Sequence, residues 1–141
     1  MNLGKFIDGI IVIIGACIGY MFGELDELLT VLIAVTVLDY ITGVLVAIVK
    51  KQFSSEIGFR GICKKIMMFM VVALAHIIDE HIIQSGSGLR TAAIFLFIAN
   101  EGVSLLENAG AMGVPIPEKL LKILQQLKLS SKNEENKEEK S

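Results

Sequence analysis

Asp39 is the residue best placed for chemistry, because it is an acidic side chain near the middle of the otherwise apolar run of residues 28–49. A carboxylate near the centre of a bilayer costs a few kcal/mol and needs a partner or water. At about 100° per residue, Thr36, Tyr40 and Gly43 lie on the same side of a helix as Asp39. We expect this polar seam to meet a neighbouring helix or to line a wet lumen. The other interpretation is an acid that is protonated or hydrogen-bonded inside a packed bundle.

A second polar stripe runs through residues 89–109. Its side chains project into an arc of about 120°, while apolar residues cover the rest of the helix. The stripe consists of Asn100, Glu101, Ser104, Glu107 and Asn108. Such a helix could lie flat on a membrane, or it could stand upright with its stripe facing other stripes around water.

Metal, redox and catalytic chemistry find little support in the sequence. His76, Asp79 and Glu80 share one side of a helix with Lys65 and suggest metal ligation or a proton relay, but they lack the partners of a metal-binding signature. The two cysteines are far apart and form no CxxC motif. We find no nucleophile elbow, phosphate-binding loop or zinc-protease motif. The sequence therefore predicts no enzyme, no cofactor and no metal site.

Small residues at four-residue spacing predict close helix packing. Gly15, Gly19 and Gly23 form GxxxGxxxG in the first apolar stretch, and Gly43 and Ala47 repeat the spacing in the second. Missing side chains let another helix approach closely. Self-association of whole chains and packing within one chain use the same surface, and we weigh the two interpretations evenly.

The composition indicates that these residues lie in lipid rather than in water. The chain has 141 residues, of which 53% are hydrophobic and 20% charged, and its mean hydropathy is +0.65. Soluble chains contain about 45–50% apolar and about 25% charged residues. A net charge of −2 supplies no field for a polyanion, which excludes nucleic-acid binding. Acidic residues rather than a cleavage site follow the first apolar stretch, so we expect no cleavable signal peptide.

Four stretches approach the length of about 20 mostly apolar residues that crosses a membrane. They are residues 6–23, 28–49, 66–83 and 89–109, the last two more polar than the first two. We predict an all-α, multi-pass membrane protein with three to four spans. Positive charges in short loops mark the cytoplasmic side. The basic residues that place the loop of residues 50–65 there are Lys50, Lys51, Arg60, Lys64 and Lys65. Both termini are then cytoplasmic, and residues 84–90 form the outer turn.

The C-terminal part has a different character. Glycines and prolines at Gly110, Gly113, Pro115 and Pro117 end the fourth stretch and start a new element. Leucines at helical spacing predict an amphipathic helix over residues 117–129 that rests on the inner leaflet. Residues 130–141 are charged and polar, which favours a disordered cytoplasmic tail after a membrane domain of residues 1–129.

Three segments together resemble the toxin-secretion and phage-lysis holin family. They are residues 38–43, a basic segment with Ser54, Ser55, Gly58, Gly61, Lys64 and Lys65, and residues 101–117, whose order of acid, Ser, Glu-Asn and Gly-x-Pro-x-Pro is the most specific part. The likeness covers most of the chain, about residues 28–127. The matched positions are Asp39, Gly43, Gly58, Lys64, Lys65, Glu101, Ser104, Glu107, Asn108, Gly113, Pro115 and Pro117. The chain departs from the family in its more polar third stretch.

The resemblance implies a small protein of the bacterial cytoplasmic membrane, carried by a phage or prophage, that assembles into lesions. Through these lesions an endolysin, or in some relatives a large toxin, leaves the cytoplasm. Its partners would be other copies of itself, the lipid bilayer and an antiholin. As a hypothesis for the mechanism, glycine faces pack the chains densely, polar stripes become lumen walls, and unmatched acids favour the assembled state. The alternatives are a small-solute channel or transporter and an antiholin that regulates a partner holin.

Overall fold

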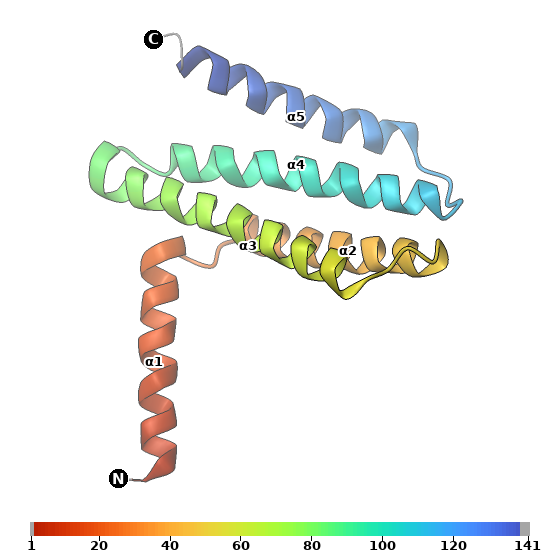
Figure 1. Ribbon diagram of the computed structural model, residues 1–141. Helices are drawn as coiled ribbons and strands as arrows, with labels where there is room; N and C mark the ends of the chain where they lie inside the picture. Colours follow the sequence, from red (N-terminus) through yellow and green to blue (C-terminus); the bar gives the residue numbers. More distant parts are fainter. Residues whose placement is uncertain (1, 139–141) are drawn as a thin grey trace.

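The computed structural model describes residues 2–138, and its regular elements over that range are all helices (Figure 1). Their order is α1 (Leu3–Phe22), α2 (Glu27–Val49), α3 (Ser55–Ile78) with a π-helical end (Asp79–Ile83), α4 (Gly88–Ala111) and α5 (Glu118–Glu138). The predicted all-α class is confirmed. Within residues 2–138, four helices are long and apolar enough to cross a membrane, namely α1, α2, α3 together with its π-helical end, and α4.

The basic loop predicted at residues 50–65 is wrong over most of its length. α3 begins at Ser55, so only a short turn joins α2 to α3. The physical reason is a helix cap: the Ser54 hydroxyl accepts a hydrogen bond from the Ile57 amide at 3.2 Å, which satisfies a donor that the first helical turn leaves open. Arg60, Lys64 and Lys65 therefore lie on a helix.

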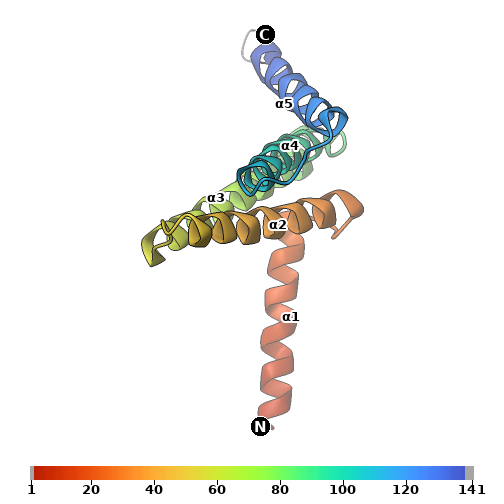
Figure 2. The same ribbon diagram turned by 90° about the vertical axis from the view of Figure 1, so that its right-hand side faces the viewer.

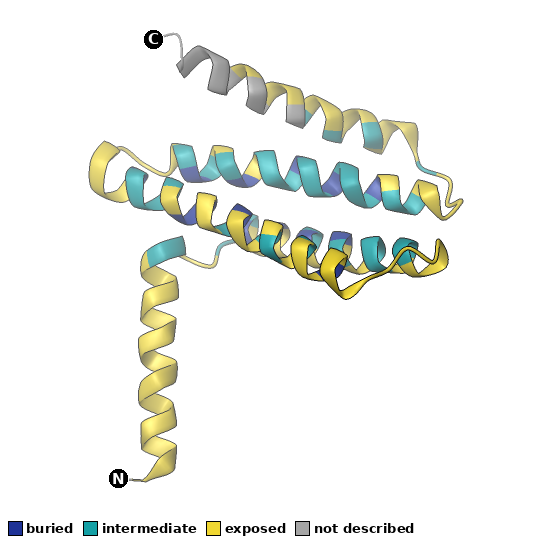
Figure 3. Ribbon diagram, viewed as in Figure 1, coloured by how far each residue is buried: buried dark blue, intermediate teal, exposed yellow. Residues whose placement is uncertain are grey.

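α1 stands apart from the other helices. It runs across their direction and joins them only at its C-terminal end (Figures 1 and 2). There the Phe22 and Phe69 rings meet edge to face at 6.3 Å, and Tyr20 lies beside His81 with ring centroids 5.5 Å apart. Its side chains are exposed along almost all of its length (Figure 3). This helix is thus the part of the bundle with the most uncovered apolar surface.

α2, α3 and α4 pack together, and their contact zone changes character along its length. The half near α1 holds the hydrophobic core. It consists of Leu29, Leu32, Met68, Val72 and Ile94, with phenylalanines packed around it. The other half, near the turn between α2 and α3, contains a group of polar residues contributed by all three helices. Close packing of these apolar side chains holds the three helices together and fixes the polar half beside it.

α5 folds back along α4 (Figure 1). The sequence favours a disordered tail from residue 130, whereas the structure continues the helix to Glu138. The added segment contains glutamates and lysines, which have good helix propensity. Residues 139–141 of the expected tail lie outside the described range.

Candidate functional site

Lys65 of α3 joins two acidic side chains that are far apart in the sequence. Its ammonium group donates to the Asp39 carboxylate of α2 at 2.7 Å and also to the Glu101 carboxylate of α4. The three side chains are 18%, 10% and 15% exposed. One cation thus holds three helices together through two shielded ion pairs, which we call the Lys65 triad.

Asn108 extends this network along α4. Its side-chain amide donates to Asp39 Oδ1 at 3.2 Å and to Thr42 Oγ1 at 3.1 Å. The Thr42 hydroxyl in turn donates to backbone carbonyls of its own helix. Asp39 therefore accepts from both Lys65 and Asn108, and its charge is compensated inside a single chain.

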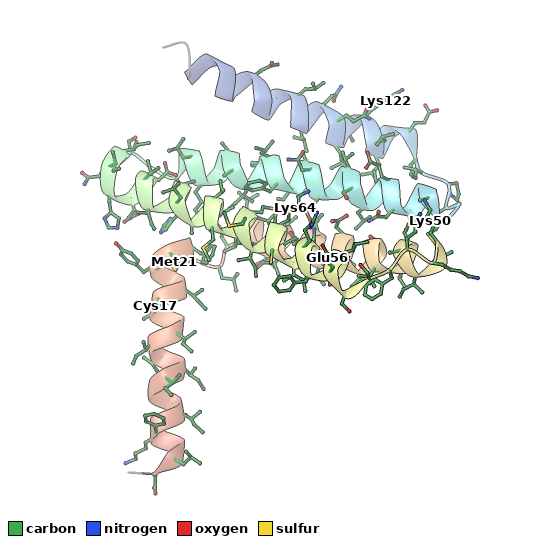
Figure 4. All side chains as sticks on the ribbon, viewed as in Figure 1. Cys17, Met21, Lys50, Glu56, Lys64 and Lys122 are labelled. Carbon is green, nitrogen blue, oxygen red and sulfur yellow. The ribbon has the colours of Figure 1, made fainter. Side chains whose placement is uncertain are left out.

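The triad lies in a cavity of about 790 Å³ between α2, α3 and α4. Most of the polar and small residues that the sequence singles out line this one space. They are Asp39, Gly43 and Ala47 from α2, Lys64 and Lys65 from α3, and Asn100, Glu101, Ser104, Glu107 and Asn108 from α4. Figure 4 shows Lys64 toward the middle of the bundle, where α3 and α4 run side by side. The two predicted polar stripes thus face each other across a cavity.

Two of the acids expected to be unmatched, Asp39 and Glu101, have partners within the chain. Asp39 meets neighbouring helices of its own chain and is hydrogen-bonded there, an arrangement that both interpretations of this residue include. Gly43 also packs within the chain, since a Cβ there would lie 3.6 Å from the Asn108 amide nitrogen. Glu107 lines the cavity but stays exposed.

The three glycines of the GxxxGxxxG motif, two in α1 and one directly after it, have different surroundings. A Cβ on Gly15 or Gly19 would meet nothing within 4 Å. Gly23 has φ +74°, and a Cβ there would lie 2.7 Å from the His76 ring. Gly23 is therefore required by its backbone conformation and by a close contact, while Gly15 and Gly19 leave an open face.

Tyr40 lies between α2 and α3 beside the cavity. Its hydroxyl donates to the Gly58 carbonyl at 3.4 Å, and a Cβ on Gly61 would be 3.5 Å from its ring. The two glycines of the basic segment therefore leave room for this tyrosine on one face of α3. This contact gives a packing reason for two glycines that the sequence marks only by family resemblance.

Arg90 holds the opposite end of the bundle and is only 5% exposed. Its guanidinium donates to the Phe22 carbonyl at 2.9 Å, to the Glu24 carbonyl at 3.0 Å and to the Asp26 carboxylate at 2.7 Å. Asp79 accepts the Arg90 amide at 2.8 Å and so caps α4. The turn between α1 and α2 is thereby fastened to the start of α4.

The same contact changes the acidity of Asp26, which lies in the turn between α1 and α2. The hydrogen bonds from the Arg90 guanidinium and from the Leu29 amide hold the pKa of the Asp26 carboxyl below its usual value of 3.8. Asp26 also caps α2 by accepting from the Leu29 amide at 2.9 Å. Both roles need the charged form of this side chain.

Two of the residues considered for a metal have structural contacts instead. Asp79 caps α4 and His76 covers Gly23, while Glu80, the third residue considered, is exposed. In the described part of the chain, no group of three histidines, cysteines or acids is arranged to hold a metal ion.

Two residues of this architecture escape sequence reasoning. The sequence indicates Lys65 as a basic charge on the cytoplasmic side and on one helix side with His76, Asp79 and Glu80, but not as the partner of Asp39 and Glu101. It indicates Arg90 only as a charge at the end of a span. The available sequence signal for the contact between Arg90 and Asp26 has two parts. An arginine lies beside one predicted turn, and an aspartate lies in the other predicted turn on the same side of the membrane.

Comparison with known proteins places the chain among relatives of similar length. The profile of the Bacteriophage holin family matches residues 16–129. A probable holin of Bacillus phage phi105 is 37% identical over 98 residues, which cover 70% of this chain and 71% of the phage protein. An uncharacterized protein of Listeria innocua is 43% identical over 126 residues, 89% of each chain. An uncharacterized 14.9 kDa protein of Clostridium perfringens is 40% identical over 127 residues, 89% of this chain and 96% of the relative. No solved structure matches.

Proposed function

Because this chain belongs to the bacteriophage holin family, we propose that it is a holin: it oligomerises in the bacterial cytoplasmic membrane and forms lesions that release an endolysin to the cell wall. Family membership and four apolar helices make it a multi-pass membrane protein. The activity proposed is passage of a macromolecule through an assembly, which requires no catalytic residue.

The polar cavity between α2, α3 and α4 is the observation that carries this proposal. Its walls combine Asp39, Lys65 and Glu101 with the amide and hydroxyl groups of the α4 stripe. Such groups are costly in hydrocarbon unless they are paired or hydrated. Within one chain the triad pairs them. When chains gather and the helices part, the same groups can be hydrated as the wall of a shared lumen.

The proposed form before lysis is the bundle with the Lys65 triad closed. Lesion formation then exchanges contacts within a chain for contacts between chains. The open glycine face of α1, at Gly15 and Gly19, supports such contacts because a second helix can approach its backbone closely. Dependence on many chains would produce an abrupt onset rather than a gradual leak.

Charge distribution supports an orientation with the C-terminus in the cytoplasm. The turn between α2 and α3 carries Lys50 and Lys51, and α4 ends at the same end of the bundle. Basic residues favour the cytoplasmic side. The end of the bundle that contains Arg90, Asp26 and Asp79 would then face the outer side of the membrane.

The test is induced expression in a bacterium with and without a cytosolic endolysin. Optical density, membrane potential and release of a large cytosolic reporter enzyme are recorded together. We expect abrupt depolarisation, reporter release, and lysis only when the endolysin is present. Depolarisation with the endolysin and reporter retained would overturn the proposal in favour of a small-solute channel, and uninterrupted growth would favour an antiholin.

A matched pair of variants connects this assay to the cavity. Glu107→Leu removes an exposed acid from the cavity wall without touching the Lys65 triad, and we expect it to shift the onset of depolarisation. Val37→Leu changes an exposed apolar residue of α2 and should leave the onset unchanged. Equal timing for both variants would contradict a lumen role for the α4 stripe.

A further inference from the structure

α5 packs on α4 through one leucine stripe. Leu121, Leu124 and Leu127 are half-buried, whereas Lys119 and Lys122 on the other side are exposed. Figure 4 shows Lys122 on α5 away from the remaining helices. Among the described residues, α4 is the helix against which α5 rests. The position of α5 therefore depends on this single contact.

At the centre of that contact, the Leu124 side chain of α5 packs on Gly102 of α4. A Cβ at Gly102 would lie 3.1 and 3.2 Å from the two terminal methyl carbons of Leu124, so a larger residue there would push the leucine away from α4. Near the turn, Ile116 lies in the same way on Gly110, where a Cβ would be 3.2 Å from the isoleucine Cδ1. Glycines in α4 therefore shape the surface that α5 covers.

The outer face of α5 conflicts with the insertion of α4 in lipid. α4 is long and apolar enough to span a membrane, and α5 lies beside it with Glu118 and Lys122 side chains that are 89% and 72% exposed. A lysine facing the hydrocarbon centre costs about 2.5–3.5 kcal/mol on insertion scales. The first part of α5, residues 118–129, carries three lysines and one glutamate, and a basic amphipathic helix is stable at an anionic membrane surface. α5 therefore has a competing location away from α4.

We propose that α5 is an autoinhibitory cover: it occupies the α4 face centred on Gly102, and after it moves to the membrane surface a helix of a second copy of this chain packs there. The choice of a second copy rests on the proposed holin function. Gly102 is the feature that would let two α4 backbones approach closely. A chain with α5 on α4 cannot make that contact, which keeps chains separate while they accumulate.

The experiment uses the full-length chain in vesicles of phosphatidylethanolamine and phosphatidylglycerol. Spin labels attached after Thr91→Cys and Ser130→Cys, at two positions that line one small cavity between α4 and α5, report whether α5 lies on α4. Both natural cysteines are changed to alanine. An amine cross-linker measures dimer yield in the same samples. Neither readout depends on lysis, so failure of this proposal and failure of the holin function are distinguishable.

Three variants give different expectations. Leu124→Gln weakens the contact of α5 with α4. The ratio of chains with the long label distance to chains with the short one should rise about 5- to 30-fold, the range expected for losing one partly buried leucine. Dimer yield should rise as well. Gly102→Leu also displaces α5, but it fills the face that the second copy needs, so dimer yield should fall. Leu129→Gln, at a position that is 62% exposed, should change neither readout.

The opposite signs separate autoinhibition from a purely structural role. If α5 only supported the fold, Leu124→Gln and Gly102→Leu would change dimer yield in the same direction, and the proposal would be overturned. It would also be overturned if Leu124→Gln kept the short label distance, or if Leu129→Gln had the effect of Leu124→Gln.

Discussion

Replacing Lys65 with methionine removes the cation between Asp39 and Glu101 while keeping a long unbranched side chain. The two carboxylates are only 10% and 15% exposed. Removing one partner of a shielded ion pair costs about 3–5 kcal/mol, because the remaining charge has lost its counter-charge and is not fully hydrated. We expect Lys65→Met to lower the free energy of unfolding by about that amount in mixed detergent micelles, followed by circular dichroism.

The neighbouring residue provides the control. Lys64 is exposed, so Lys64→Met should change stability by about 0.5 kcal/mol or less. Adding Asp39→Asn and Glu101→Gln to Lys65→Met should recover most of the loss, since no buried charge is then unpaired. A cost below about 1 kcal/mol for Lys65→Met, as in exposed ion pairs, would refute the triad as the link between the three helices.

Three further outcomes follow from the α1 end of the molecule. Arg90 holds the pKa of the Asp26 carboxyl below 3.8. The charged form of Asp26 therefore stabilises the fold above that pH, and this stabilisation is lost as the pH falls through the lowered pKa. Asp26→Asn should therefore lower Tm at pH 6, and the difference from the unmodified chain should shrink below about pH 4; a constant difference would argue against the ion pair. Gly23→Ala should lower the free energy of unfolding by about 1–3 kcal/mol, measured in micelles, because its backbone conformation is nearly restricted to glycine. Gly15→Leu combined with Gly19→Leu should leave Tm unchanged but reduce cross-linked oligomers in vesicles, and an unchanged oligomer yield would exclude α1 as a contact between chains.

The periodicity of the sequence predicts which side chains share a face. It places Asp39 and Gly43 on one seam, and Glu101, Ser104 and Asn108 on one stripe, and all five line the same cavity. Angular position along a helix is fixed by residue spacing alone, so such inferences transfer directly to the structure. The all-α class follows from the same apolar patterns.

The partners of these faces could not be derived in this way. Lys65 lies 26 residues from Asp39 and 36 from Glu101, and spacing within one helix carries no information on which helix faces another. The early start of α3 obscures Lys65 further, because residues 55–65 are polar enough to resemble a loop. The contact between Leu124 and Gly102 likewise depends on how α5 folds back. The amphipathic pattern of α5 does not distinguish a helix that rests on lipid from one that packs on protein.

In the proposed holin function, the walls of the cavity between α2, α3 and α4 line the lesion. This role is tested by Ser104→Cys, in a chain with Cys17 and Cys63 changed to alanine, and a membrane-impermeant thiol reagent added outside the cells. We predict no labelling before depolarisation and rapid labelling after it, while Val37→Cys, on the exposed face of α2, stays unlabelled throughout. Ser104→Cys that stays protected after depolarisation, or labelling of both positions alike, would contradict the account.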